Sequence, residues 1–276
     1  MEEPRQKEKE KTEQQSEQEA TEGTQTKRYT SKFLLSDEEI KALGVRACDV
    51  ELFRRKHYTS CFGIETWYEA LQDHTFHTLS VPLSVEEAEA IVDGRRSRLD
   101  EGGRQLLDDL RERLHSLLET EFPGGAFIKL DTRSPKDVPV YDFENEAVQQ
   151  LIRDELERLY PDKQPSVRDT NMLANAIIIG TNRFMKVTNG EEALNLLIRS
   201  DRVKEDLVRA LPYRHFAWTT KLILREWWDE VPERPQYEFR CFVHSNQLNA
   251  MTQYFSCCKC KCNVIFLSLS LSLSHI

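Results

Sequence analysis

Apolar residues recur along this chain with two different periods, which predict strands in some segments and helices in others. In residues 221–243, KLILREWWDEVPERPQYEFRCFV, the period is two, as in β-strands. The first run divides into two faces, Lys221, Ile223, Arg225 and Trp227 against Leu222, Leu224, Glu226 and Trp228. The second divides into a nearly apolar face and a mixed one, Tyr237, Phe239, Cys241 and Val243 against Glu238, Arg240 and Phe242. We therefore predict two strands that are joined through a Pro-rich turn.

Helical spacing predicts many of the other elements. Two capping boxes, Ser36–Glu39 and Ser84–Glu87, predict short helices over Asp37–Leu43 and up to Gly94. A leucine stripe predicts a longer amphipathic helix, after a break at Gly102 and Gly103 and before Pro123, on Leu106, Leu107, Leu110, Leu114, Leu117 and Leu118. Three further helices are predicted over Glu144–Tyr160, Glu191–Ile198 and Arg202–Leu211.

Runs rich in β-branched and aromatic residues predict additional strands. They lie in TFHTLSVPL (75–83), in the first part of AFIKLDTRSPKDVPVYDF (126–143), in Asn175–Ile179, in Phe216–Trp228 and in Leu248–Tyr254. The second of these is followed by a Ser-Pro turn and another extended piece, and the last follows a tight turn at Ser245-Asn246. The sum is a mixed α+β protein with a largely antiparallel sheet late in the chain.

Net charge, apolar runs and cysteine content argue against several classes of protein. The chain has 276 residues and a net charge of −9, which argues against a nucleic-acid-binding protein, because such proteins carry a basic stripe. No run is long enough to cross a bilayer, and no signal peptide is apparent. The seven cysteines suggest no disulfide framework. We expect a soluble cytoplasmic protein without direct membrane contact.

The two ends of the chain differ from its middle. Residues 1–30 are rich in mixed charge and poor in apolar residues, so we expect them to be disordered and the folded region to span 31–255. From Ser256 a cysteine cluster, CCKCKC, precedes a strict Leu-Ser alternation. A metal-thiolate cluster is one interpretation, although separated ligand pairs are missing. We favour another, in which residues 256–276 are an aberrant low-complexity tail encoded by translated non-coding sequence.

Cationic residues on predicted strands are the candidate site. Guanidinium groups bind phosphates and carboxylates through a rigid fork of donors, which gives Arg225 and Arg240 a chemical use. They could equally be solvated or lie in structural ion pairs. For Lys129, on the predicted strand before the Ser-Pro turn, the pattern by itself favours an edge lysine that blocks strand pairing.

Three segments, quoted from the sequence, resemble a known family. They are TFHTLSVPL after Trp67-Tyr68, FIKLDTRSPKD (127–137), and LILREWWDEVPERPQYEFRCFV (222–243). The second is similar to F-P-K-L-N-W-S-A-P-R-D and the third to L-V-L-R-K-W followed, after a spacer, by E-F-R-C-F-V. These are motifs of the cell division cycle protein 123 family, whose fold is related to the ATP-grasp enzymes. Departures include Asp131-Thr132 for Asn-Trp, Val138 for Ala, and a longer spacer before Tyr237.

The resemblance implies an ATP site between two lobes of sheet. Lys129 would reach the phosphates, under a loop of Ser134, Pro135 and Lys136. Arg240 would be a phosphate arginine. The hinge beside adenine would consist of Arg225, Glu226 and Trp227, with backbone groups reading the edge of the base.

The family also implies Mg²⁺, held by an Asp and a following Asp-x-Asn pair. Hard cations need such oxygen ligands, but no Asp or Glu follows Glu238 here. We therefore expect the ATP-grasp-like sheets to be incomplete at the C-terminal end and the metal ligands to be absent. Weak ATP binding and a tendency to aggregate are the predicted consequences.

Three functions remain open. The resemblance implies an ATP-binding assembly chaperone for eukaryotic translation initiation factor 2, which binds the gamma subunit of that factor and links translation initiation to cell-cycle progression. ATP would be a bound ligand, so we favour a binding protein over an enzyme. The alternatives are an ATP-grasp ligase or kinase acting on a small molecule or peptide, and a paralogue that acts as an interaction module without nucleotide.

Overall fold

The computed structural model describes residues 36–51, 53–54, 63–94, 99–141, 145–161, 170–215, 218–244 and 247–255. The expected disordered segment 1–30 and the tail 256–276 lie outside these ranges. The chain divides between Val50 and Glu51 into two compact units. In the described part of the chain, no helix is both long and apolar enough to cross a membrane.

The first unit contains the short helix α2 (Asp37–Ala42) and the 3-10 turn η1 (Ala47–Asp49). The predicted capping box is present, because the Ser36 side chain accepts from the Glu39 N–H at 3.2 Å and the Glu39 carboxylate accepts from the Ser36 N–H at 2.7 Å. This reciprocal pair satisfies two of the donors that a helix start leaves open.

The second unit mixes helices with antiparallel strands and confirms the predicted α+β class. Its helices are α4 (Glu65–Leu71), α5 (Val85–Gly94), α6 (Glu101–Glu121), α7 (Val138–Tyr141), α8 (Glu146–Leu159), α9 (Thr170–Arg183), α10 (Gly190–Arg199), α11 (Asp201–Ala210) and α12 (Glu230–Glu233). The 3-10 turns are η2 (Gln72–His74), η3 (Leu211–Tyr213) and η4 (Pro235–Tyr237). The strands are β1 (Thr78–Pro82), β2 (Ala126–Leu130), β3 (Lys186–Val187), β4 (Lys221–Glu226), β5 (Phe239–His244) and β6 (Gln247–Gln253).

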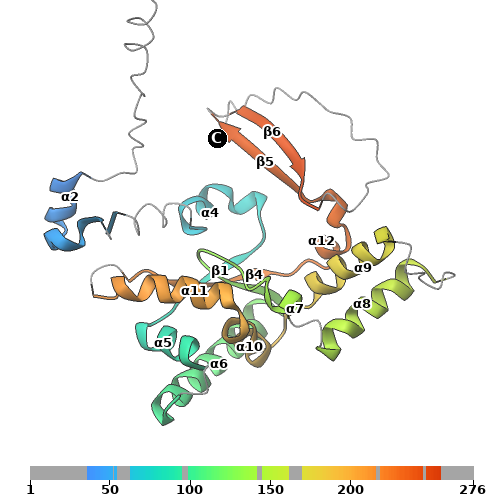
Figure 1. The fold of residues 1–276 in the computed structure, drawn as a ribbon, viewed down its shortest axis with the longest axis horizontal. Coiled ribbons are helices and arrows are strands. Elements are labelled where there is room, and N and C mark those ends of the chain that lie inside the picture. The colour runs from blue at the N-terminus through green and yellow to red at the C-terminus, as the bar shows by residue number, and fades with distance from the viewer. Residues whose placement is uncertain are drawn as a thin grey trace, which may run out of the picture. The chain divides into compact units, whose positions relative to one another are not determined.

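The strands form two separate sheets (Figure 1). Four strands pair in the order β1-β4-β2-β3, and every pairing is antiparallel. The register sets Lys129 of β2 opposite Ile223 of β4, and Phe127 opposite Arg225. Because cross-strand partners point to the same side of a sheet, Lys129 and Arg225 share one face.

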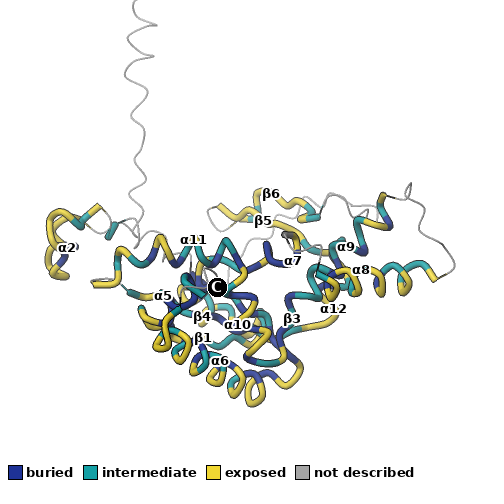
Figure 2. The backbone as a smooth tube through the Cα atoms, turned by 60° about the horizontal axis from the view of Figure 1, so that its bottom comes forward, coloured by how far each residue is buried: buried dark blue, intermediate teal, exposed yellow. Residues whose placement is uncertain are grey.

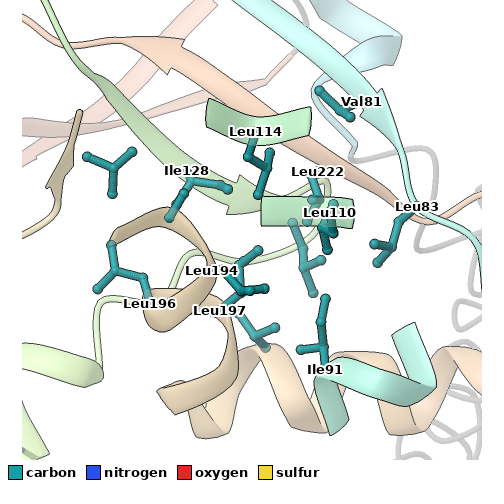
Figure 3. Packing of buried hydrophobic residues seen from close by; sticks show 14 of the residues in the cluster. Val81, Leu83, Ile91, Leu110, Leu114, Ile128, Leu194, Leu196, Leu197 and Leu222 are labelled. Atoms are coloured by element: carbon teal, nitrogen blue, oxygen red, sulfur yellow. The ribbon is translucent and has the colours of Figure 1, made fainter. Parts of the chain in front are cut away.

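The opposite face of this sheet carries the core. Figure 3 shows Val81, Ile128 and Leu222 from three strands packed with leucines of α6 and α10 and with Ile91 of α5. The predicted leucine stripe of α6 supplies four buried residues, Leu107, Leu110, Leu114 and Leu118. Apolar burial of this kind contributes roughly 25 cal/mol per Å² removed from water. Apolar packing on this face therefore stabilises the sheet, and the cationic side chains lie on the face that does not carry the core.

Three local predictions were wrong. Gly102 and Gly103 do not separate two elements but lie in the first turn of helix α6. There the Asp100 carboxylate accepts a hydrogen bond from the Gly103 N–H at 2.7 Å. This N-cap offsets the poor helix propensity of glycine. The extended piece expected after the Ser-Pro turn contains the helical turn α7.

The predicted strand Asn175–Ile179 lies within helix α9. Helix α9, which contains the run NAIII, packs against α8. Gly180 allows the two helices to approach closely, because a Cβ at this position would lie 3.0 Å from the Ile152 backbone nitrogen. Packing against α8 thus outweighs the β-propensity of the isoleucines.

The second sheet is the β5–β6 hairpin, here called the hairpin (239–253). Its predicted return strand is confirmed, and the predicted turn at Ser245 and Asn246 lies outside the described residues. The two strand-like runs of residues 221–243 do not pair with each other, because β4 joins the first sheet and β5 the second. The segment between them forms α12 and η4. Figure 2 shows the hairpin as largely exposed.

Candidate anion-binding site

The site begins on the cationic face of the four-stranded sheet. Lys129 and Arg225 lie diagonally across from each other on β2 and β4, an arrangement that places Cβ atoms roughly 7 Å apart. They interact electrostatically, since the charge of Arg225 lowers the pKa of Lys129. Two like charges on one half-buried face favour the approach of an anion.

Lys129 is half-buried, and burial lowers the pKa of its ammonium group below its ordinary value of 10.5. The charge of Asp131 opposes this shift, and the charges of Arg225 and Lys136 add to it. Its Nζ donates to the Asp131 carbonyl oxygen at 3.3 Å. A half-buried lysine with a lowered pKa is not the solvated edge lysine that blocks strand pairing.

Arg225 is held between aromatic rings that precede β1. Its Cζ lies 5.9 Å from the Trp67 ring centroid and 5.2 Å from that of Phe76. One terminal nitrogen donates to the Thr75 hydroxyl at 2.6 Å. The Nε is buried and has no hydrogen-bond partner among the described residues. The cation is thus oriented by rings, with donor capacity left over.

Lys221 lies on the same face, but its charge is compensated. It pairs with the Glu65 carboxylate at the start of α4, and Glu65 also accepts from the Ser80 hydroxyl at 2.8 Å. The Tyr68 hydroxyl of α4 accepts from the Thr78 N–H at 3.1 Å. These contacts tie α4 to β1 and β4. They also make Lys221 a matched contrast to Lys129.

The loop after β2 is fixed at both ends to helix α11. Near its start, Arg133 donates to one Asp206 carboxylate oxygen from Nε at 2.9 Å and from a terminal nitrogen at 2.6 Å. Thr132 donates to the other oxygen at 2.5 Å. Near its end, Asp137 accepts from the Ser200 hydroxyl at 2.6 Å and from the Arg202 N–H at 3.2 Å.

These anchors hold the predicted phosphate loop in one conformation. Ser134 is half-buried and Pro135 is buried, and the Pro135 carbonyl accepts from the Val138 N–H at 3.1 Å. Lys136 is exposed at the loop's tip. The loop therefore presents Lys136 and keeps Pro135 as part of its support.

Tyr254, just after β6, brings the loop and the hairpin together. The Lys136 Nζ lies 5.7 Å from its ring centroid, and the Arg240 Cζ of β5 lies 5.0 Å from it. The Tyr254 N–H donates to the Glu238 carbonyl at 2.8 Å, which extends the strand pairing by one residue. Arg240 and Lys136, distant in sequence, thus meet at one aromatic ring.

Two backbone groups of the predicted hinge form hydrogen bonds with neighbouring segments. The Glu226 N–H donates to the His77 carbonyl at 2.8 Å, and the Trp227 N–H donates to the Gly125 carbonyl at 3.1 Å. These two donors are therefore used within the sheet, and other hinge groups would have to read the edge of a base.

The predicted alternation of the two tryptophans also fails, because β4 ends at Glu226. Trp227 packs against the core cluster, and its indole N–H donates to Asp229 at 2.8 Å, a bond that helps to lower the pKa of that carboxyl. Trp228 instead meets Phe76, with ring centroids 5.3 Å apart. The pattern of period two holds only while the backbone is a strand.

The predicted cations therefore fall into two adjoining groups. Lys129 and Arg225 lie on the sheet, Arg240 lies on the hairpin, and Lys136 is close to both groups. Within the described residues none of the four forms a salt bridge, whereas Arg133, Arg183, Lys186 and Lys221 do. Positive charge that forms no salt bridge with the described residues is what an anion needs.

Two parts of the site were not predicted from the sequence. The aromatic residues around Arg225, Trp67 and Phe76, were noted without a role, and Tyr254 was assigned only to a hairpin strand. For Tyr254, the available signal was the aromatic residues beside Arg240 in the neighbouring strand β5. Among the described residues, no group of three or more His, Cys, Asp or Glu side chains could hold a metal ion.

Comparison with known proteins gives one family. Residues 173–256 match the model of the D123 family, a range that includes the hinge, the hairpin and Tyr254 but not Lys129 or Lys136. No curated protein matches the chain. Among solved structures it is similar to Cdc123 from Schizosaccharomyces pombe, with 20% identity and a TM-score of 0.40 over 71% of this chain. A C-terminally truncated Cdc123 from the same organism gives 18% and 0.41, again over 71%. The chain spans 63% and 64% of these two proteins.

Proposed function

We propose that this chain, whose residues 173–256 match the model of the D123 family, binds the triphosphate of ATP on the cationic face of its sheet and against the hairpin. The observation that carries the proposal is the set of four cations without a salt bridge in the described structure: Lys129, Lys136, Arg225 and Arg240. Their residue types suit a polyphosphate.

Burial strengthens this argument. Removing a cation from water costs free energy unless an opposite charge compensates it. Lys129 and Arg225 are both half-buried, and burial is the main cause of the lowered pKa of each. A bound phosphate would supply the missing compensation and raise both pKa values again.

Each residue has a proposed role. Lys129 binds a phosphate oxygen from the sheet, and Lys136 and Arg240 bind from the loop and the hairpin. Ser134 and Pro135 give the loop its shape. Arg225, Glu226 and Trp227 lie beside the base. The guanidinium of Arg225 is also available to an anion, because its Nε is buried and has no hydrogen-bond partner in the described part of the chain.

A role for the whole protein, beyond binding of a phosphate, is suggested by the resemblance to the family and not by the arrangement of the cations. We propose an assembly chaperone in the cytoplasm for eukaryotic translation initiation factor 2, which binds the gamma subunit with ATP as a retained ligand. The net charge of −9 is compatible with a protein partner. Recovery of the gamma subunit from a eukaryotic lysate by the full chain supports this role. A clean failure to recover it contradicts the role without touching the phosphate site.

Calorimetric titration of the full chain with ATP tests the phosphate site. Lys129→Ala should weaken binding by about tenfold or more, as expected for loss of a charge-assisted contact. Lys221→Ala, on the same face but paired with Glu65, is the matched control and should bind like the parent. Mg²⁺ should change the affinity little. Tight binding that depends on Mg²⁺ would contradict the proposal about the metal.

The exposed hairpin supports a second candidate, an interaction module without nucleotide. Phe242 is 50% exposed, Val243 58% and Met251 45%, and the register places Phe242 and Met251 on opposite faces of the hairpin, so apolar side chains are exposed on both faces. Lys129→Ala with Arg240→Ala separates the two candidates. Unchanged binding of the gamma subunit by this double variant favours the module, and loss of binding favours the nucleotide-dependent chaperone.

A further inference from the structure

Two cations from distant parts of the chain lie close to the aromatic ring of Tyr254. Lys136 comes from the loop after β2, and Arg240 comes from β5. Both cationic groups lie within 6 Å of the same ring centroid, at 5.7 and 5.0 Å. This is the range in which a ring attracts a cation through its quadrupole.

Two like charges at one ring repel each other, and among the described residues neither charge is paired with a carboxylate. Neither Lys136 nor Arg240 forms a salt bridge with the described residues, and Tyr254 itself is 41% exposed. In the absence of a ligand, the ring is the group that attracts both cations. A cation–π contact at an exposed site is weak, so the pair is held in place but not neutralised.

We propose that Tyr254 is a positioning residue for anion binding, which holds Lys136 and Arg240 together so that one polyphosphate can bridge the loop and the hairpin. The proposal rests on the phosphate site described above and deepens it. The ordering of two long side chains is completed before the ligand arrives, which lowers the entropic cost of binding.

The arrangement also selects the length of the anion. Lys129 lies on the sheet and Lys136 is near enough for its charge to lower the pKa of Lys129, while Arg240 approaches from the other sheet. A ligand that contacts all three must extend from the β2 strand to the ring of Tyr254. We expect tripolyphosphate to bind more tightly than pyrophosphate, and pyrophosphate more tightly than inorganic phosphate.

Calorimetric titration of the full chain with tripolyphosphate tests the role of the ring. Tyr254→Leu should weaken binding by about 3- to 10-fold, since it removes two exposed cation–π contacts. Tyr254→Phe keeps the ring and should stay within about twofold of the parent. Phe242→Leu, an exposed aromatic residue of the same hairpin, is the matched control and should have no effect.

A double-mutant cycle gives a second measurement, and its first half, made in the parent chain, does not depend on the folding of Tyr254→Leu. In the parent chain, the fold-losses of Lys136→Ala and Arg240→Ala should not multiply in the double variant, because both cations act on one ligand. In the Tyr254→Leu background the losses should multiply. A purely structural role for Tyr254 would shift thermal stability but leave this coupling unchanged.

The outcomes separate this inference from the proposed function. A parent chain that binds neither ATP nor tripolyphosphate overturns both. A parent that binds, together with Tyr254→Leu of equal affinity or with losses that multiply in the parent background, overturns the role of Tyr254 and leaves the phosphate site standing.

Discussion

At the scale of single residues, the burial of Lys129 has a consequence for pH. Its pKa is lowered in the folded protein, so it loses its charge at a lower pH than an ordinary lysine as pH rises. Phosphate binding should therefore weaken across the alkaline range between that lowered pKa and the ordinary 10.5. Lys129→Arg should bind without this dependence, because arginine stays protonated. Calorimetry from about pH 7 to about pH 10 checks this. An identical pH profile for both proteins would contradict it.

The same shift affects stability with a defined sign. Between the lowered pKa and the ordinary value, the unfolded chain binds more protons at this residue than the folded chain does. The contribution of Lys129 to the free energy of unfolding therefore rises with pH in that window. Binding and stability should thus respond to pH in opposite directions.

Gly125 offers a second prediction for a single residue. Its φ of +93° lies in the left-handed region, and an added Cβ would lie 2.8 Å from Lys186 Cε and 3.2 Å from the Val187 carbonyl. Gly125→Ala should destabilise the fold by about 1–3 kcal/mol. Denaturant unfolding measures this, with Gly124→Ala, where the added Cβ meets nothing within 4 Å, as the control. Equal stability of the two variants would contradict the account.

At this scale the sequence predicts the strand face on which a residue lies better than it predicts the contacts of that residue. The alternation in residues 221–226 correctly placed Arg225 and Ile223 on one face and the core leucines on the other. It failed at Trp227, because the strand had ended. It could not reveal Thr75 and Phe76 beside Arg225, since that contact depends on how β1 pairs with β4.

At the scale of elements, the loop after β2 depends on its anchor to α11. Arg133 and Asp206 form a two-bond ion pair in which the carboxylate is 12% exposed, and Asp206 raises the pKa of Arg133. We expect a coupling of about 1–2 kcal/mol between Arg133→Ala and Asp206→Ala in unfolding experiments. Both single variants should also weaken ATP binding by a few-fold, because Lys136 would lose its fixed position. Additive effects on stability would exclude the anchor.

Elements with both a start signal and a consistent period were predicted well. The capping box at Ser84 begins α5, and the leucine stripe of α6 is buried as expected. Asn175–Ile179 was missed because a short apolar run does not distinguish a strand from a buried helix. Its tertiary partner α8, which decides the outcome, is not visible in a local window.

At the scale of the whole molecule, the hairpin is the place where self-association is expected. β6 carries no charged residue, and Met251 is 45% exposed on it. Unguarded strand edges of this kind pair with other chains. Met251→Lys should reduce the concentration-dependent growth of molecular mass seen by light scattering. Glu69→Gln, on the exposed surface of α4, raises the net charge by the same single unit and controls for the change in charge. An unchanged mass distribution for Met251→Lys would exclude the hairpin as the associating surface.

The arrangement of the site was only partly accessible from the sequence. Motif resemblance suggested Lys129, Lys136 and Arg240 as a set, and the structure brings Lys136 close to both of the others. The proximity of Lys136 to Arg240 arises from the contact of Tyr254 with the loop, and that of Lys129 to Arg225 arises from the pairing of β2 with β4. Both contacts join segments that are far apart in the sequence. No local pattern encodes such long-range geometry.

The most direct test is a crystal structure of the full chain with a non-hydrolysable ATP analogue. The account predicts phosphate oxygens within hydrogen-bonding distance of the Lys129 ammonium and the Arg240 guanidinium, with Lys136 still beside Tyr254. An analogue bound with its phosphates far from both Lys129 and Arg240 would contradict it.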